Sequence, residues 1–252
     1  MARNEQRRQK KLEAKKSKRK EEQRMVARVQ SSGTRGQMEV ARNWPVVQAR
    51  VSAGLWDHGM GEALLVRRGP GGITAYVVFL LDVYCLGVKN VVARAEPDHV
   101  AARWLTSLFE RTGPWVDVSP EHVRKLVEGS IGYAMSLGLA PHHECAGALL
   151  IFGDLDSSRC STEFTFGRDG KPLFIAGPHD NEARIYEILT TLKRTIGAEQ
   201  MDYVLPSATG KVSGELADLL EETGVRVIDA DELDSEVDSP ECESVKQLAH
   251  QD

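Results

Sequence analysis

Apolar residues are densest in the middle of the chain, where their arrangement predicts a β-hairpin. An apolar stretch at residues 63–66 is followed by two arginines, by the turn-forming residues 69–72, and by a second apolar stretch at 73–84. Two apolar runs joined by a short glycine-rich turn are typical of antiparallel strands. The second run is apolar on both faces, so we expect a central strand covered from both sides. Residues 88–94 are expected to return as a third strand or to begin a helix.

Apolar positions three and four residues apart predict helices around this hairpin. The clearest helix has Ser119 as its N-cap, Pro120 at its first position and Gly138 beyond its end. These residue types suit the two ends of a helix. Further helices are expected at residues 98–113, 141–152, 181–194 and 213–223, and short strands at 201–205 and 225–228.

A second hairpin is predicted at residues 162–176. Phe164 and Phe166 alternate with polar residues, and Asp169 and Gly170 suit the central positions of a type I′ turn. Two hairpins among several helices predict an α+β protein, with a mixed α/β arrangement as the alternative. In this architecture, antiparallel hairpins and packed helices form a single globular domain.

Charge is segregated at the two ends of the chain. Residues 1–29 contain 12 Lys or Arg and 4 Asp or Glu, a net charge of +8, and show no apolar stripe at helical spacing. Residues 229–252 contain 9 acidic residues and one lysine, a net charge of -8, which leaves -5 for residues 30–228. We therefore expect a basic arm and linker at 1–36, disordered or forming a solvated helix. A globular domain at 37–230 and a disordered acidic tail at 231–252 would follow.

The basic arm is the strongest functional feature of the sequence. A segment with this charge can approach phosphates closely and bind them with release of counterions. The arm has no aromatic residue to stack on bases, so we predict a backbone-directed tether to RNA or to a ribonucleoprotein. The cations expected to contact phosphates are Arg7, Arg8, Lys10, Lys11, Lys15, Lys16, Lys18, Arg19 and Lys20.

Two other interpretations of the charged ends stay open. The arm could be a solvated segment that aids solubility or neutralises the acidic tail. Alternatively, the chain could be a protein-interaction module whose acidic tail docks on a basic partner. The sequence does not identify this partner.

Composition and cysteine usage narrow the class of protein. Of the 252 residues, 41% are hydrophobic and 27% are charged, as in ordinary soluble globular proteins. The four cysteines show no CxxC spacing and follow no secretory signal, which predicts reduced thiols in a cytoplasm. The longest apolar run, residues 75–81, is much shorter than the roughly 20 residues of a membrane span. No membrane partner is expected.

Familiar cofactor and hydrolase motifs are missing from the sequence. Gly210 and Lys211 resemble the end of a Walker loop, but Leu205 and Val212 occupy the positions that need glycine and a hydroxyl residue. Dinucleotide-binding GxGxxG, zincin HExxH and GxSxG patterns are absent as well. We therefore expect no cofactor. The absence of these motifs favours a non-catalytic protein over an enzyme.

A metal-dependent hydrolase or nuclease is the alternative function. Asp82 interrupts an apolar strand, and Asp154 and Asp156 follow a predicted helix, so the three carboxylates could bind a divalent cation and activate water. An ionised carboxylate inside an apolar strand is costly unless it is paired or hydrogen-bonded. The simpler interpretation pairs Asp82 with Lys89 or with a backbone turn at the strand end. For Asp154 and Asp156 it is an ordinary turn.

Imidazole and thiol side chains provide a second set of metal-binding candidates. Zinc prefers four converging nitrogen or sulfur ligands, and the sequence offers His142, Cys145, Cys160 and His179. Their spacing matches no recognised zinc motif, and buried cysteines are often core residues. We therefore expect no metal site, with these four residues as weak candidates.

Three segments of the chain resemble a family of uncharacterised bacterial proteins, which often carry a Lys-rich N-terminal arm. The segments are FLLDVYCLGVKN at 79–90, EGSIGYAMSLGLAPH at 128–142 and FGRDGKPLFIAGP at 166–178. The resemblance covers about the middle half of the chain. It implies a single cytoplasmic bacterial domain, and it brings no assigned activity and no functional residue.

Overall fold

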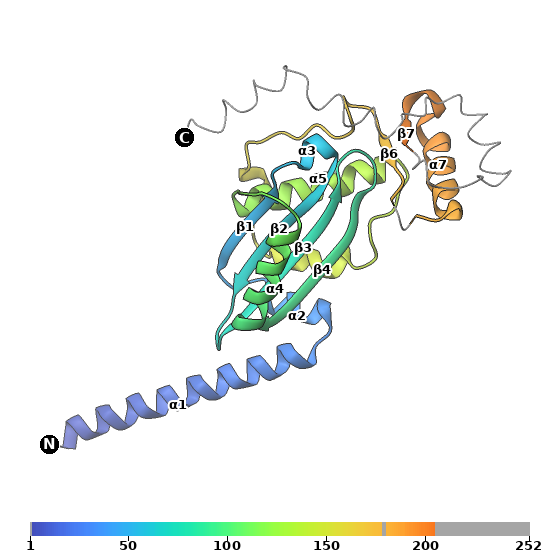
Figure 1. Ribbon diagram of the computed structural model, residues 1–252. Coiled ribbons are helices and arrows are strands. Elements are labelled where there is room, and N and C mark those ends of the chain that lie inside the picture. Colours follow the sequence, from blue (N-terminus) through green and yellow to red (C-terminus); the bar gives the residue numbers. More distant parts are fainter. Residues whose placement is uncertain (1, 178–179, 205–252) are drawn as a thin grey trace.

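The computed structural model describes residues 2–177 and 180–204, which are built around a five-stranded sheet (Figure 1). The strands lie in the order β4-β3-β2-β1-β5, and all neighbours are antiparallel. Their bounds are β1 (Val46–Ser52), β2 (Met60–Arg68), β3 (Ile73–Asp82), β4 (Gly87–Pro97) and β5 (Trp115–Asp117). A second sheet pairs β6 (Leu173–Ile175) with β7 (Asp202–Val204) in parallel.

The first predicted hairpin is confirmed as β2 and β3. Arg68 pairs with Thr74 beside the turn, and Gly71 and Gly72 have φ angles of 72° and 73°, a conformation that glycine adopts without steric cost. Nine of the ten β3 residues are buried, as expected for a strand between two neighbours. The segment after it is the third strand, β4, and does not begin a helix.

Side-chain caps set the starts of two long helices, and the first of them, Ser119, was predicted from the sequence. The Ser119 side chain accepts a hydrogen bond from the His122 amide at 3.1 Å and begins α5 (Pro120–Ser136). Asn181 caps α7 (Glu182–Ile196) by accepting from the Arg184 amide at 2.9 Å. The helix predicted from residue 98 is α4 (Asp98–Arg111). Residues 213–223 and 225–228, predicted as a helix and a strand, lie outside the described residues.

The second predicted hairpin is wrong. Asp169 and Gly170 have the positive φ angles expected of them, but only the bridge between Arg168 and Lys171 forms around that turn. Phe164 and Phe166 pack against aromatic rings of the body instead of pairing in a sheet. Farther along, β6 pairs in parallel with β7, and Phe174 of β6 and Tyr203 of β7 share a buried cluster with α7.

Helices cover both faces of the main sheet (Figure 1). On one face, α5 packs across β1 to β4, together with α2 (Thr34–Ala41), α6 (Cys145–Ala148) and the 3-10 turn η1 (Leu149–Phe152). The predicted helix at 141–152 is thus divided into α6 and η1. On the other face, α4 covers β3 and β4, where Leu105 and Leu108 meet Tyr76 and Val78. This arrangement confirms the α+β class and the single globular domain.

The basic arm was expected to be either disordered or a solvated helix, and it forms the helix α1 (Ala2–Ser31). Residues 34–36, expected to belong to the arm and linker at 1–36, are the first residues of α2. Val29 is fully buried and Val26 packs against the core, so among the described side chains of α1 those in its last turns contribute to the body. Within the described ranges, no helix is both long and apolar enough to cross a membrane. The domain boundaries suggested by charge stay predictions.

Candidate nucleic-acid interface

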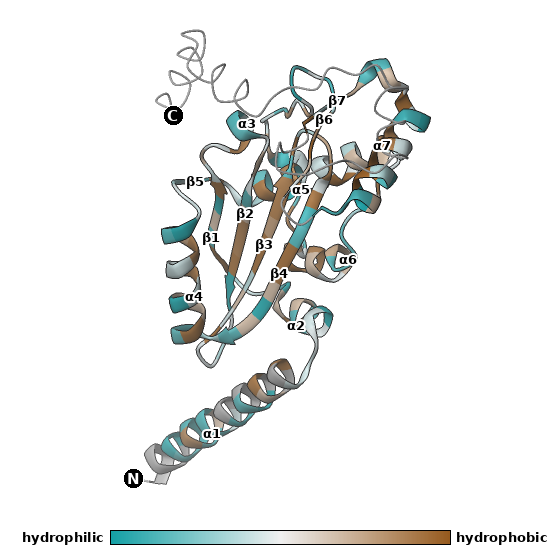
Figure 2. Cartoon of the chain, turned by 45° about the vertical axis from the view of Figure 1, so that its right-hand side comes forward, coloured by the Kyte–Doolittle hydropathy of each residue, from teal (hydrophilic) through white to brown (hydrophobic). Residues whose placement is uncertain are grey.

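Helix α1 projects away from the body as a long polar rod (Figure 1, Figure 2). At about 1.5 Å per residue, its 30 residues extend for about 45 Å. Figure 2 shows hydrophilic residues on all its visible sides, and apolar residues gather near its junction with the body. A helix of this length without a covered apolar face offers nearly its whole circumference to solvent.

The predicted phosphate-binding cations lie on this exposed helix. Arg7, Lys11 and Lys15 are four residues apart and therefore share one side of it. The cations whose side chains are described as exposed are Arg7, Arg8, Lys10, Lys11, Lys15, Lys16, Lys20 and Arg24. Lys18 and Arg19 belong to the same helix, but their side chains are outside the described part of the structure.

Gln37 of α2 fixes the end of α1 to the edge of the main sheet. Its amide nitrogen donates to the carbonyls of Val29 at 3.3 Å and Ser32 at 3.2 Å, and its amide oxygen accepts from the Ala95 amide of β4 at 3.0 Å. One side chain thus joins the helix end, the connection and an edge strand. Nothing in the local sequence predicted this role, because the contact with the sheet comes from Ala95, 58 residues away in the chain.

Asp82 serves the turn at the end of β3. Its Oδ1 accepts hydrogen bonds from the amides of Tyr84 at 3.1 Å and Cys85 at 2.8 Å. The carboxyl is buried, and this burial raises its pKa from 3.8 to about 6, against the lowering effect of the two amides and of Lys89. Lys89 itself forms its ion pair with Asp180, at 3.8 Å. These contacts agree with the simpler interpretation, a backbone turn at the strand end.

Asp156 is the N-cap of a short 3-10 helix. Its Oδ1 accepts from the Ser158 amide at 3.1 Å and from the Ser158 hydroxyl at 2.7 Å, which begins the 3-10 turn η2 (Ser157–Arg159). These hydrogen bonds lower the pKa of the Asp156 carboxyl. Asp154 and Asp156 are both exposed, whereas Asp82 is buried.

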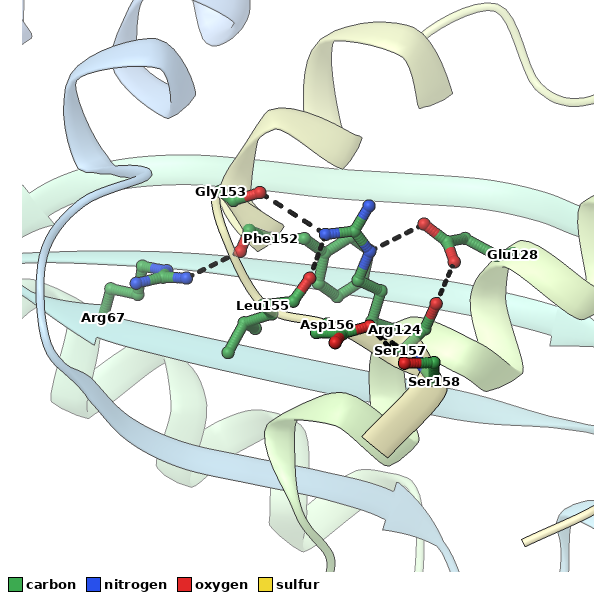
Figure 3. A network of polar contacts seen from close by, with 9 residues as sticks. All are labelled: Arg67, Arg124, Glu128, Phe152, Gly153, Leu155, Asp156, Ser157 and Ser158. Carbon is green, nitrogen blue, oxygen red and sulfur yellow. Dashed lines mark hydrogen bonds and ion pairs between the residues drawn. The ribbon is translucent and has the colours of Figure 1, made fainter. Parts of the chain in front are cut away.

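Two arginines hold the segment that carries these aspartates (Figure 3). Arg67 of β2 is buried and donates to the carbonyls of Ile151 at 2.7 Å and Phe152 at 2.8 Å, and also to that of Trp44. Arg124 of α5 donates to the Leu155 carbonyl and pairs with Glu128 at 2.7 Å. Neither role was predicted from the sequence, although Arg67, at the end of an apolar strand, carries the signal of a buried cation that needs partners.

The histidine and cysteine candidates have mainly structural contacts. The His142 Nδ1 accepts from the Glu144 amide at 3.3 Å. Cys145 is buried, and burial raises the pKa of its thiol to about 11. Cys160 is buried as well, and its carbonyl accepts from Lys125 at 3.2 Å. His179 lies outside the described residues.

The geometry brings together neither set of candidate metal ligands. Among residues 2–177 and 180–204, no three His, Cys, Asp or Glu side chains gather in a group that could hold a metal ion. Of the three carboxylates, Asp82 lies in a buried turn, whereas Asp154 and Asp156 lie in an exposed segment.

A groove between α4 and β1 has a volume of about 620 Å³ and a mixed charge. Arg50 pairs there with Asp117 at 2.6 Å and lies over the Phe109 ring, 5.1 Å from its centroid. Arg68 and Asp98 also line the groove, so its cations and anions are balanced. It therefore offers a polyanion less attraction than α1 does.

Comparisons of the chain with protein-family models, with curated proteins and with solved structures give no match. The resemblance to a bacterial family therefore stays an expectation from the three sequence segments.

Proposed function

We propose that this protein is a cytoplasmic RNA-binding protein that contacts the phosphate backbone through α1. The observation that supports the proposal most strongly is the projecting helix with exposed cations along its length. The free thiols of Cys85, Cys145 and Cys160 agree with a reducing compartment. In this proposal the globular domain is the part that α1 tethers to RNA or to a ribonucleoprotein.

Backbone contacts fit α1 better than base contacts do. Lysine and arginine bind phosphates, whereas reading a single-stranded base requires stacking or hydrogen bonds to its edge. Residues 2–31 contain no aromatic residue, and the cations surround the helix instead of forming one narrow recognition face. Binding should therefore depend on charge and vary little with RNA sequence.

The polar groups of the body favour binding over hydrolysis. Asp82 and Asp156 accept hydrogen bonds from backbone amides two or three residues away, and buried Arg67 donates to three carbonyls. These groups satisfy turns and loops of the fold itself. The exposed cations of α1 differ because their positions suit an external partner.

The salt dependence of RNA binding tests the proposal. The affinity of the full chain for single-stranded RNA homopolymers of different bases is measured over a range of salt concentrations. With at least six phosphate contacts, the slope of log K against log salt is expected near -4, since each contact adds about -0.7. All homopolymers should give similar slopes. A slope near zero, or binding to one homopolymer only, would contradict a contact through the phosphate backbone.

A further inference from the structure

Helix α1 has the charge pattern of a surface that needs a counter-charge. Its net charge is strongly positive, and the pairs Arg7 with Lys11, Lys11 with Lys15, and Lys16 with Lys20 are four residues apart. Like charges at this spacing repel each other and destabilise a helix. The described side chains at residues 7–17 are all exposed, so tertiary packing does not offset the repulsion there.

The same chain contains a segment of opposite and equal charge. Residues 229–252 have a net charge of -8, against +8 for residues 1–29. Residues 30–228 carry -5, so the body as a whole does not attract this acidic segment. The groove beside α4 does not attract it either, since the two arginines that line it are balanced by two aspartates. Among the parts of the chain, α1 is the surface whose charge complements residues 229–252.

The connecting chain is long enough for the contact. Figures 1 and 2 both show β7 and α1 at opposite ends of the body. The 24 residues from 205 to 228 can span up to about 80 Å when extended. By comparison, β3 runs the length of the main sheet in 10 residues, or about 33 Å. The acidic segment can therefore reach α1 of its own chain around the body.

We propose that residues 229–252 bind along α1 of the same chain through ion pairs and occupy the surface that RNA would use. The contact is polar because α1 has no apolar face beyond its last turns. Each exposed ion pair contributes little binding free energy, so the contact needs many ion pairs and weakens as salt screens them. The competition with RNA rests on the proposed function, whereas the contact between the two charged segments does not.

Carbodiimide crosslinking of the full chain tests the contact without RNA. The reagent joins a lysine amine to a carboxylate only when the two groups touch. At about 50 mM salt, mass spectrometry is expected to find links between α1 lysines and acids of residues 229–252 within one chain, and these links should be lost above about 0.5 M salt. Links that join two chains as a covalent dimer, or no links between these segments, would overturn the proposal.

RNA affinity tests the competition with a matched pair of full-length variants. One variant carries Asp231→Asn, Glu232→Gln, Asp234→Asn and Glu236→Gln. The control neutralises four exposed acids of the body, Asp57→Asn, Asp169→Asn, Glu110→Gln and Glu199→Gln. At low salt the first variant is expected to bind RNA at least about threefold more tightly than the native chain, and the control less than about 1.5-fold more tightly.

The two measurements separate the two proposals. Intramolecular links without any RNA binding would contradict the proposed function and leave the contact between the charged segments in place. RNA binding that both variants strengthen equally would overturn the competition, because a general change of net charge would then explain it.

Discussion

The arginines of α1 and Arg67 of β2 have the same side chain in opposite surroundings. Arg67 is 4% exposed, and its guanidinium donates to the carbonyls of three residues from two other segments. Arg7, Arg8 and Arg24 lie on an exposed helix. A buried guanidinium is stable only when its donors are satisfied by the protein, whereas an exposed one remains available to a partner. The position of a cation in the fold therefore distinguishes a structural role from a binding role.

Replacing the buried Arg67 is expected to lower the stability of the fold more than any other change considered below. Arg67→Met keeps the bulk of the side chain but leaves the carbonyls of Trp44, Ile151 and Phe152 without these donors. We expect the free energy of unfolding to fall by about 3–5 kcal/mol in urea titrations. The exposed control Arg103→Met should change it by less than about 0.5 kcal/mol. Equal effects of the two variants would contradict a structural role for Arg67.

The pH dependence of stability tests the buried carboxyl of Asp82. Its pKa is about 6 in the folded protein, above the ordinary value of 3.8. The protonated form therefore stabilises the fold at low pH, and this contribution is lost as pH rises through about 6. Asp82→Asn keeps an oxygen acceptor for the two turn amides and cannot ionise.

Relative to Asp82→Asn, the native free energy of unfolding should fall by about 2–3 kcal/mol between about pH 4 and pH 7. Urea titrations of both proteins across this range measure the difference. If the difference between the two proteins stayed constant with pH, the carboxyl would not titrate in the folded state as described.

Gln37 connects the end of α1 to the main sheet, and its replacement should loosen α1 without unfolding the body. Gln37→Ala removes the acceptor of the Ala95 amide and the donor to the carbonyls of Val29 and Ser32. Hydrogen exchange should show a loss of local protection of about 2 kcal/mol at Ala95 and in the last turn of α1. Gln37→Glu keeps the acceptor, so it should preserve protection at Ala95 while the end of α1 loosens. Unchanged exchange in both variants would contradict the anchoring role.

The sequence predicted the parts of the fold that depend on local signals. The glycine-rich turn before Ile73 and the cap at Ser119 were identified correctly, because each acts on neighbouring residues. The hairpin at 162–176 was predicted wrongly. Its turn has the expected φ angles, but Phe164 packs on Trp56, at 5.8 Å between ring centroids. Tertiary packing overrode the alternating pattern there.

The same distinction applies to the candidate sites. The exposure of the α1 cations followed from the lack of an apolar stripe, which is a local property. The separation of buried Asp82 from exposed Asp154 and Asp156, and the roles of Gln37 and Arg67, depend on contacts between distant segments. No spacing along the chain encodes such contacts, so only the structure could show them.

The most direct test of the account compares RNA binding by two full-length variants with equal loss of charge. In one variant, Lys10, Lys11, Lys15 and Lys16 of α1 become Gln, which preserves helix propensity. In the other, the exposed body residues Arg103, Arg111, Arg159 and Arg194 become Gln. At about 0.1 M salt, the α1 variant should bind RNA at least about tenfold more weakly than the native chain and show a shallower salt slope. The body variant should stay within about twofold of the native affinity, and equal losses in the two variants would contradict the central claim that α1 binds RNA.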